Sequence, residues 1–140
     1  MDYSSGFGRS IKGFTLIELM VALAILAIIV AVAIPAYTTY VVRSNRTEGK
    51  VIAMQAAQAL ERCYTRYSAY NSDECDIGFP LSSENDWYEV TVDDLAASAF
   101  TVIATPQGSQ ATRDDGCGNL TLNHQGVRGV SGDDPVDDCW

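Results

Sequence analysis

Four cysteines are the side chains in this sequence with the most evident chemistry, and they lie far apart. They are Cys63, Cys75, Cys117 and Cys139. None forms a C-x-x-C pair, and the chain has a single histidine, so a zinc site lacks its usual ligands. Disulfide bonds are the better interpretation, and they persist only in an oxidising compartment outside the cytoplasm. Four cysteines allow three pairings, of which we take nearest neighbours as the working expectation: Cys63 with Cys75, and Cys117 with Cys139.

The other reactive side chains form no catalytic or metal-binding pattern. The sequence contains no G-x-S-x-G, P-loop, H-E-x-x-H or dinucleotide-binding motif, and His124 has no second histidine or paired cysteine beside it. Four aspartates near the end of the chain lack the alternating spacing of an EF-hand and its final glutamate, which favours a solvated acidic loop. They are Asp133, Asp134, Asp137 and Asp138. We therefore expect no enzyme activity, no cofactor and no bound metal.

Glu18 is the one carboxylate at the start of a long apolar stretch. A charge inside a membrane helix costs about 2.5–3.5 kcal/mol by insertion scales, so such a residue needs a partner. If the peptide bond after Gly13 is cut, Phe14 gains a free α-amine. That amine on a neighbouring subunit could then pair with Glu18. The alternative is that Glu18, being near the helix end, extends to the membrane interface.

The apolar stretch that follows is long enough to cross a bilayer. Residues 19–42 carry no charge, and a membrane helix needs about 20 apolar residues. A cleaved secretory signal would place its small-residue site after the apolar run, whereas Lys12-Gly13 precedes it, so cleavage there would keep the anchor. Pro35 removes one backbone hydrogen bond, and we expect the helix to kink or loosen at residues 34–38. Disulfides outside the cytoplasm place the leader on the cytoplasmic side and the C-terminal part in the periplasm.

The run from Lys12 to Met20, KGFTLIELM, resembles the prepilin signature of type IV pilins and type II secretion pseudopilins. The resemblance implies that the prepilin peptidase cuts after Gly13 and methylates the new N-terminus to give N-methylphenylalanine at Phe14. It also implies that Glu18 contacts a neighbour's N-terminal amine during assembly, and that Pro35 is the helix-loosening proline of many family members. The tail from Cys117 to Trp140 looks like that of PilE/ComP-type minor pilins.

The helical pattern continues beyond the apolar run, and one helix from Phe14 to about Tyr67 is predicted. Its apolar residues at helical spacing should face a sheet. They are Ala53, Ala56, Leu60, Cys63 and Tyr67. Three basic residues share another face and should lie at the membrane boundary or meet acidic residues of a neighbour. They are Arg43, Arg46 and Lys50.

The fold class predicted is α+β, a type IV pilin fold in which the long helix packs on a small antiparallel sheet. Strands are expected at residues 87–92, 99–104 and 119–123, with loops at residues 71–84 and 126–138. The predicted parts are a leader at residues 1–13, a transmembrane and polymerisation helix at 14–42, the periplasmic half of the helix at 43–70 and a head at 71–140. Five aromatic residues are assigned to the core rather than to a binding patch. They are Tyr64, Tyr67, Tyr70, Trp87 and Tyr88.

The net charge of the C-terminal part bears on whether the chain binds nucleic acid. From Asn71 onward the chain has fourteen acidic residues against Arg113 and Arg128, a net of −12. Nucleic acid is therefore an unfavourable direct partner unless these two arginines and His124 are clustered.

We interpret the chain as a structural subunit, favouring a minor pilin, of a type IV pilus that supports adhesion, twitching motility or DNA uptake. Its expected partners are other pilin subunits, the prepilin peptidase, the inner-membrane assembly machinery and the membrane itself. The precursor should lie in the bacterial inner membrane with its head in the periplasm, and the mature chain in the extracellular filament. The alternatives are a type II secretion pseudopilin and a pilus-exposed DNA-uptake receptor.

Overall fold

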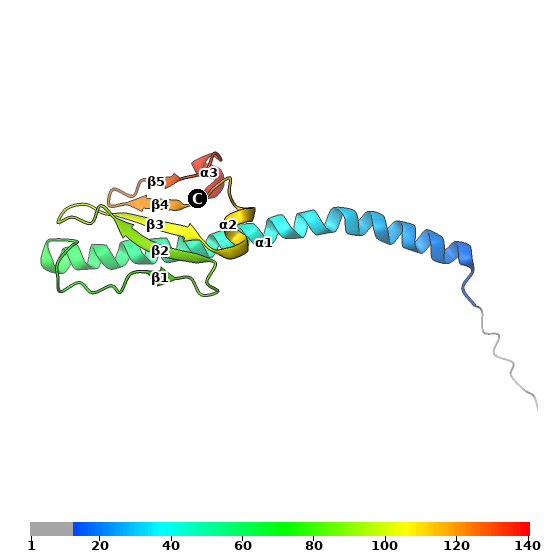
Figure 1. Cartoon of the computed structure of the whole chain (residues 1–140), viewed down its shortest axis with the longest axis horizontal. Coiled ribbons are helices and arrows are strands. Elements are labelled where there is room, and N and C mark those ends of the chain that lie inside the picture. Colours follow the sequence, from blue (N-terminus) through cyan, green and yellow to red (C-terminus); the bar gives the residue numbers. More distant parts are fainter. Residues whose placement is uncertain (1–12) are drawn as a thin grey trace, which may run out of the picture. The chain divides into compact units, whose positions relative to one another are not determined.

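The computed structural model describes residues 13–140, so the predicted leader lies outside the described residues except for Gly13. The chain divides into two compact units, one ending at Thr38 and the other running from Thr39 to Trp140. The helix α1, Leu16–Tyr67, belongs to both units (Figure 1). The predicted helix, from Phe14 to about Tyr67, therefore agrees with α1 to within two residues.

Local interactions explain where α1 begins and where it ends. At its start the hydroxyl of Thr15 accepts a hydrogen bond from the backbone N–H of Glu18 at 3.3 Å, which satisfies one of the free donors of the first turn. At its end Ser68 adopts a left-handed conformation with φ of 58°, as is common after the last helical residue. Pro35 lies inside the helix without ending it, and the hydroxyl of Thr38 donates to the Pro35 carbonyl at 2.9 Å.

Five antiparallel strands follow in the order β1-β2-β3-β4-β5 (Figure 1). They are β1 Leu81–Ser82, β2 Tyr88–Asp93, β3 Thr101–Pro106, β4 Leu120–Asn123 and β5 Arg128–Val130. The three predicted strands correspond to β2, β3 and β4 within two residues. The assignment of residues 71–84 and 126–138 as loops was wrong in part, since they contain the edge strands β1 and β5. Two short helices were also not predicted: α2, Gly108–Arg113, and α3, Val136–Cys139.

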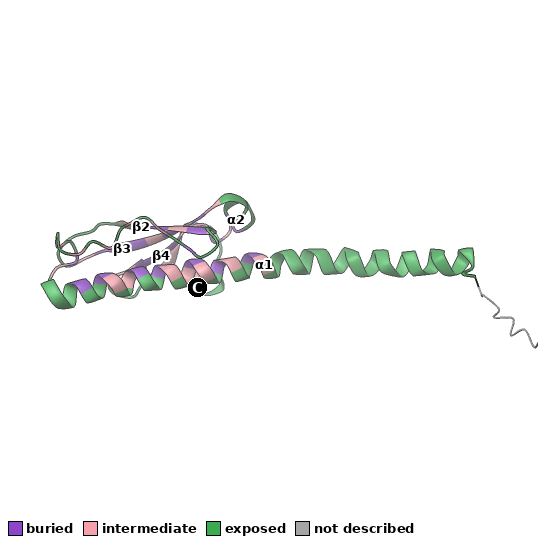
Figure 2. Ribbon diagram, turned by 90° about the horizontal axis from the view of Figure 1, so that it is seen from below, coloured by how far each residue is buried: buried purple, intermediate pink, exposed green. Residues whose placement is uncertain are grey.

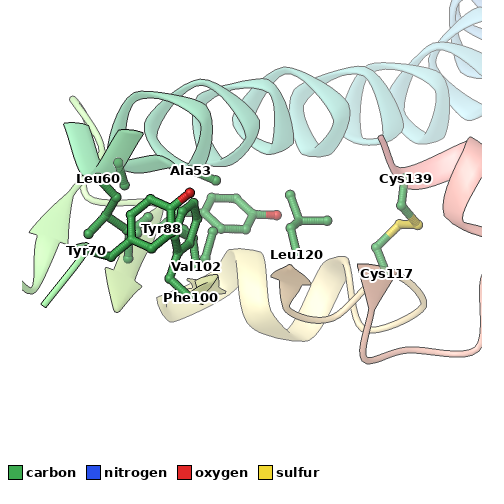
Figure 3. Packing of buried hydrophobic residues seen from close by; sticks show 12 residues of the cluster. Ala53, Leu60, Tyr70, Tyr88, Phe100, Val102, Cys117, Leu120 and Cys139 are labelled. Carbon is green, nitrogen blue, oxygen red and sulfur yellow. A yellow bond between two sulfur atoms is a disulfide. The ribbon is translucent and has the colours of Figure 1, made fainter. Parts of the chain in front are cut away.

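One face of the sheet packs against α1 (Figure 2). Antiparallel pairing sets Val90 opposite Ala104, and Ala104 opposite Leu120, so these three buried side chains form a row across the central strands. Tyr70, Phe100 and Leu60 continue the same core toward the C-terminal end of α1 (Figure 3). The predicted helix face is buried at Ala53, Ala56, Leu60 and Cys63.

The assignment of the aromatic residues to the core was only partly right. Tyr70 and Tyr88 are buried and Trp87 is half-buried, whereas Tyr64 and Tyr67 are about two-fifths exposed, at 40% and 37%. Tyr67 is the last residue of α1 and Tyr64 lies one turn before it. The helix therefore ends with two aromatic rings that helical periodicity alone places in the interior.

Gly49 lies where α1 meets the ring of Tyr88. A Cβ atom at this position would come within 2.8 Å of the ring carbons Cγ and Cδ1. In an exposed helix Gly→Ala raises stability by about 1 kcal/mol, but overpacking a core costs about 1–3 kcal/mol. We expect Gly49→Ala to lower the free energy of unfolding by about 1 kcal/mol in urea titrations. Ser44→Ala, at an exposed position of the same helix, should be neutral or slightly stabilising, and a Gly49→Ala chain more stable than the parent would contradict this contact.

Candidate assembly site

The bond proposed for cleavage lies in a short non-helical segment before α1. Gly13, Phe14 and Thr15 have no regular secondary structure, and Phe14 is 86% exposed. A Cβ atom built at Gly13 would meet nothing within 4 Å. Among the residues that the structure describes, nothing therefore shields the Gly13–Phe14 bond from a protease.

Glu18 stands in the first turn of α1 and is exposed. Within residues 13–140 the only ion pair joins Arg46 to Asp114, so the Glu18 carboxylate has no ionic partner in the described part of its own chain. The unsatisfied N–H groups of a helix N-terminus favour a negative charge there. This position leaves the carboxylate available for a cation from outside the chain.

The first unit exposes a continuous apolar surface. Residues 13–38 are all exposed, and they include large side chains such as Leu16, Ile28 and Ile34. α1 is long and apolar enough to cross a membrane by length and composition. Exposed apolar patches of this extent mark a membrane or protein contact surface. Either lipid tails or the apolar helices of other subunits could cover this surface.

For Arg46, the prediction that the basic residues of the helix share one outward face was wrong. It is buried, with 9% relative exposure, and its Nη2 forms an ion pair with Oδ1 of Asp114 in the same chain. Its Nε donates a second hydrogen bond to Oδ2 of Asp114 at 2.9 Å, giving a two-point contact between guanidinium and carboxylate. Arg46 therefore holds the head to the helix and pairs with an acid of its own chain instead of an acid of a neighbour. Arg43 is exposed and Lys50 is half-buried.

Asp114 is the centre of a buried polar network that sequence reasoning missed. The hydroxyl of Tyr88 donates to its Oδ2 at 2.9 Å, and Nε2 of Gln110 donates to the same atom at 3.0 Å. Nε2 of Gln110 also reaches the Val42 carbonyl at 3.1 Å, while Nη1 of Arg46 donates to the Asp138 carbonyl at 3.0 Å. The network thus joins α1, α2, β2 and α3. Hydrogen bonding to Asp114 is the main cause that raises the pKa of Arg46.

The buried hydroxyl of Tyr88 is expected to make the head less stable at alkaline pH. Burial is the main cause that raises the pKa of Tyr88, and the charge of Asp114 adds to it. Burial also raises the pKa of Tyr70, with help from its bond to Glu61. An unfolded tyrosine loses its proton at about pH 10 while these two native ones keep it, so stability should fall above pH 10 by up to about 1.4 kcal/mol per pH unit for each.

In urea titrations from pH 8 to 11.5, the free energy of unfolding of Tyr88→Phe should therefore fall less steeply above pH 10 than that of the parent. The fall that remains should be the part caused by Tyr70. Below pH 9 the two curves should run parallel, because both tyrosines are then neutral in the folded and unfolded chain. An unchanged slope above pH 10 would contradict the shift at Tyr88.

Two disulfides crosslink the second unit. Cys63 at the end of α1 bonds Cys75 with their Cα atoms 5.9 Å apart, and Cys117 bonds Cys139 with a Cα separation of 5.7 Å (Figure 3). Cys117 and Cys139 lie near the carboxylate of Asp134, but a sulfur in a disulfide is no thiolate ligand for a metal. Asp133, Asp134, Asp137 and Asp138 are exposed, in keeping with an acidic surface segment.

The three residues that would have to cluster for duplex binding are not together. The backbone N–H of His124 bonds the Phe100 carbonyl at 3.1 Å, just before β3 begins, whereas Arg113 ends α2, which follows β3. A strand of this length separates its two ends by roughly 15–20 Å. Arg128, on the edge strand β5, lies opposite Leu122, two residues before His124, so only Arg113 is set apart from the other two.

This architecture, a long helix with an exposed apolar N-terminal part and a five-stranded antiparallel head, defines the class of type IV pilins. A family model described as "Type IV minor pilin ComP, DNA uptake sequence receptor" matches residues 35–121, and one for the prokaryotic N-terminal methylation motif matches residues 8–34. The first match covers more than half of the chain. The chain therefore belongs to this family of type IV minor pilins, whose members are structural proteins.

Curated relatives agree with this assignment. The chain is 33% identical over 94 residues to the fimbrial protein EcpC of Eikenella corrodens, covering 67% of this chain and 61% of the relative. It is 39% identical over 72 residues to the type IV major pilin protein PilE of Neisseria gonorrhoeae, covering 51% of this chain and 43% of the relative. The matches thus span about half the length of these relatives.

Solved structures share the fold. A type IV pilin from Shewanella oneidensis superposes with a TM-score of 0.53 at 29% identity, over 71% of this chain and 97% of that chain. The non-core minor pilin PilV of Neisseria meningitidis gives a TM-score of 0.53 at 23% identity, over 69% of this chain and 94% of that chain. The second likeness bears on the fold alone.

Proposed function

We propose that this chain is a structural subunit, specifically a minor pilin, of a type IV pilus. The observation that carries the proposal is the exposed apolar part of α1 directly after an accessible Gly13–Phe14 bond. The match of residues 8–34 to the methylation motif supports the same bond as the processing site. The chain then has the two features that a filament subunit needs, a defined new N-terminus and an apolar helix surface that must be covered.

Each part of the helix has a role in this proposal. The prepilin peptidase cuts after Gly13 and methylates Phe14, and residues 14–42 hold the chain in the inner membrane with the head in the periplasm. The assembly machinery then moves the subunit into the filament, where lipid contacts are exchanged for contacts with other pilin helices. Glu18 sets the register through the amine of a neighbouring subunit, and Pro35 lets the helix adjust locally. Adhesion, twitching motility and DNA uptake are the activities such a filament would serve.

Mass spectrometry of filaments sheared from cells tests the proposal. We expect a peptide that begins at methylated Phe14, in small amounts relative to the main pilin. An abundant peptide would assign this chain as a major subunit instead. Mature chain that stays in the envelope would favour a type II secretion pseudopilin, and an uncut Gly13–Phe14 bond would overturn the proposal.

A second candidate function comes from the family description, which names a DNA uptake sequence receptor. The fourteen acidic residues after Asn71 and the separation of Arg113 from His124 argue against strong binding through the phosphates. A receptor should bind duplex DNA with an affinity that falls steeply as salt rises. Binding of the purified chain at physiological salt, lost on Arg128→Ala, would favour this function; no binding at any salt would exclude it.

A further inference from the structure

The two edges of the sheet differ in charge. The strand order places β1 at one edge and β5 at the other (Figure 1). At the β5 edge are two cations, Arg128 on β5 itself and Lys50 on α1, which lies close enough for the two charges to interact. Beside β1 lie three carboxylates, on Glu48 of α1 and on Glu84 and Asp86 of the β1–β2 turn. We refer to Lys50, Arg128 and Trp140 as the basic flank, and to Glu48, Glu84 and Asp86 as the acidic flank.

The cations of the basic flank are not neutralised within the chain. Neither Lys50 nor Arg128 forms an ion pair among residues 13–140. Burial is the main cause that lowers the pKa of Lys50, and the positive charges of Arg46 and Arg128 lower it further. Asp114 acts in the opposite direction, but its carboxylate is already bonded to Arg46. Lys50 and Arg128 thus form a positive site whose two charges are not paired with a carboxylate among the residues that the structure describes.

Arg128 is held in place at this edge. Its guanidinium carbon lies 5.3 Å from the centre of the Trp140 ring, within the range of a cation–π contact. The ring is fixed in turn because its Nε1 donates to the Gly129 carbonyl at 2.9 Å. The aspartates of the segment that follows β5 are exposed, and none of them forms an ion pair with Arg128 among residues 13–140.

The acidic flank is a groove rather than a flat surface. A cavity of about 610 Å³ lies between α1 and β1, and its lining contains Glu48 and Glu84 but no lysine or arginine. Glu48 is held by Asn85, whose Nδ2 donates to it at 2.8 Å. Glu84 and Asp86, both in the β1–β2 turn, are exposed. Val51 and Ile52 supply an apolar floor.

We propose that the basic flank of one copy of this chain docks on the acidic flank of a second copy, with Lys50 and Arg128 paired to Glu84, Asp86 or Glu48. The inference rests on the proposed function as a filament subunit, and it concerns filaments in which copies of this chain are neighbours, as in cells that overexpress it. Since the two flanks are different surfaces at opposite edges of the head, the contact is head-to-tail and leaves a free flank on each copy, as a helical filament requires. Charge pairs of this kind set partner choice and register more than affinity.

Lys50 allows a direct test, because it is the only lysine after Gly13. A carbodiimide joins an amine to a touching carboxylate as an amide and takes up the water that is lost. Treatment of filaments from cells that overexpress the full chain should give a dimer whose crosslinked peptide joins Lys50 to Glu84, Asp86 or Glu48. Lys50→Arg should abolish the crosslink and keep the amount of chain in the filaments, since its charge is kept.

Charge reversal gives the second arm. In filaments from the same overexpressing cells, Lys50→Glu with Arg128→Glu, or Glu84→Lys with Asp86→Lys, should each lower incorporation at least about tenfold, because like charges of neighbouring copies then face each other. The four changes together should restore it, whereas Arg113→Glu, on the exposed end of α2, should have no effect. Normal levels of disulfide-bonded chain in the membrane would show that the variants fold.

The outcomes separate the two proposals. A parent chain absent from filaments would overturn the proposed function and this inference with it. A parent chain present in filaments whose Lys50 crosslinks to another protein, to another part of the head or to nothing would overturn the inference alone. Failure of the four-fold reversal to restore incorporation would do the same.

Discussion

Replacing Asp114 by alanine is expected to lower the free energy of unfolding by about 3–5 kcal/mol, because it leaves the buried charge of Arg46 without its partner. The guanidinium loses both contacts to the carboxylate, and the hydroxyl of Tyr88 loses its acceptor. Burial prevents water from replacing either contact, since Asp114 is only 3% exposed. The loss should release α2 and the Asp138 end of α3 from the helix before the rest of the core opens.

Urea titration of the full chain in detergent, followed by the fluorescence of Trp87 and Trp140, measures this change. The matched control is Asp115→Ala, which removes the same group from the next residue, where it is exposed. A surface change of that kind should stay within about 0.5 kcal/mol of the parent. An Asp114→Ala chain that is as stable as Asp115→Ala would show that the network does not hold the head to α1.

A double variant separates the charge from the packing. Arg46→Met combined with Asp114→Leu removes both charges together and leaves no unpaired ion in the interior. Replacing a buried ion pair by apolar side chains of similar size is often neutral or stabilising. We therefore expect the double variant to be more stable than Asp114→Ala alone, and a cost equal to the sum of the single changes would mean that the pair is not coupled.

Local patterns were enough for most of the fold. The uncharged run and the helical spacing after it predicted α1, and alternating β-branched residues predicted β2, β3 and β4. The edge strands were missed because they are short: β1 has two residues, Leu81–Ser82, and β5 has the sequence Arg-Gly-Val, so neither is long enough to show alternation. Their strand character comes from pairing with β2 and β4, which is a tertiary effect.

The candidate sites also differ in whether a local sequence pattern or only tertiary packing identifies them. Gly13, Phe14 and Glu18 lie within six residues and form a motif that can be read directly from the chain. Arg46 and Asp114 are 68 positions apart, and Asp114 follows Arg113 in a polar segment with no sign of burial. Since helical spacing places Arg46 beside Arg43 and Lys50, it was assigned to the surface with them. Contacts of Arg46 with Asp114, which follows α2, and with Asp138 of α3 make it an interior residue, and these are tertiary contacts.

Glu18→Ala is expected to reduce the amount of cleaved chain in sheared filaments at least about tenfold, since an ammonium group left unpaired in apolar packing costs several kcal/mol. The chain itself offers no substitute nearby, because Glu18 is the only acidic residue among residues 14–47. The Phe14 amine of an incoming subunit would then meet only the apolar side chains that α1 exposes. Mature chain should accumulate in the membrane instead.

Three comparisons by quantitative mass spectrometry isolate the charge from other effects. Leu19→Ala removes a side chain of similar length from the next position without changing charge, and it should leave incorporation within about threefold of the parent, since only part of one exposed apolar contact is lost. Glu18→Gln keeps the shape and loses the charge, so it should resemble Glu18→Ala, whereas Glu18→Asp should recover part of the signal. In the proposed order of events cleavage after Gly13 precedes pairing, so all three variants should carry Phe14 as their first residue. Cleaved Glu18→Ala chain at parental levels in filaments would mean that the apolar helix surface alone sets the register, and that the Glu18 carboxylate only stabilises the first turn of α1.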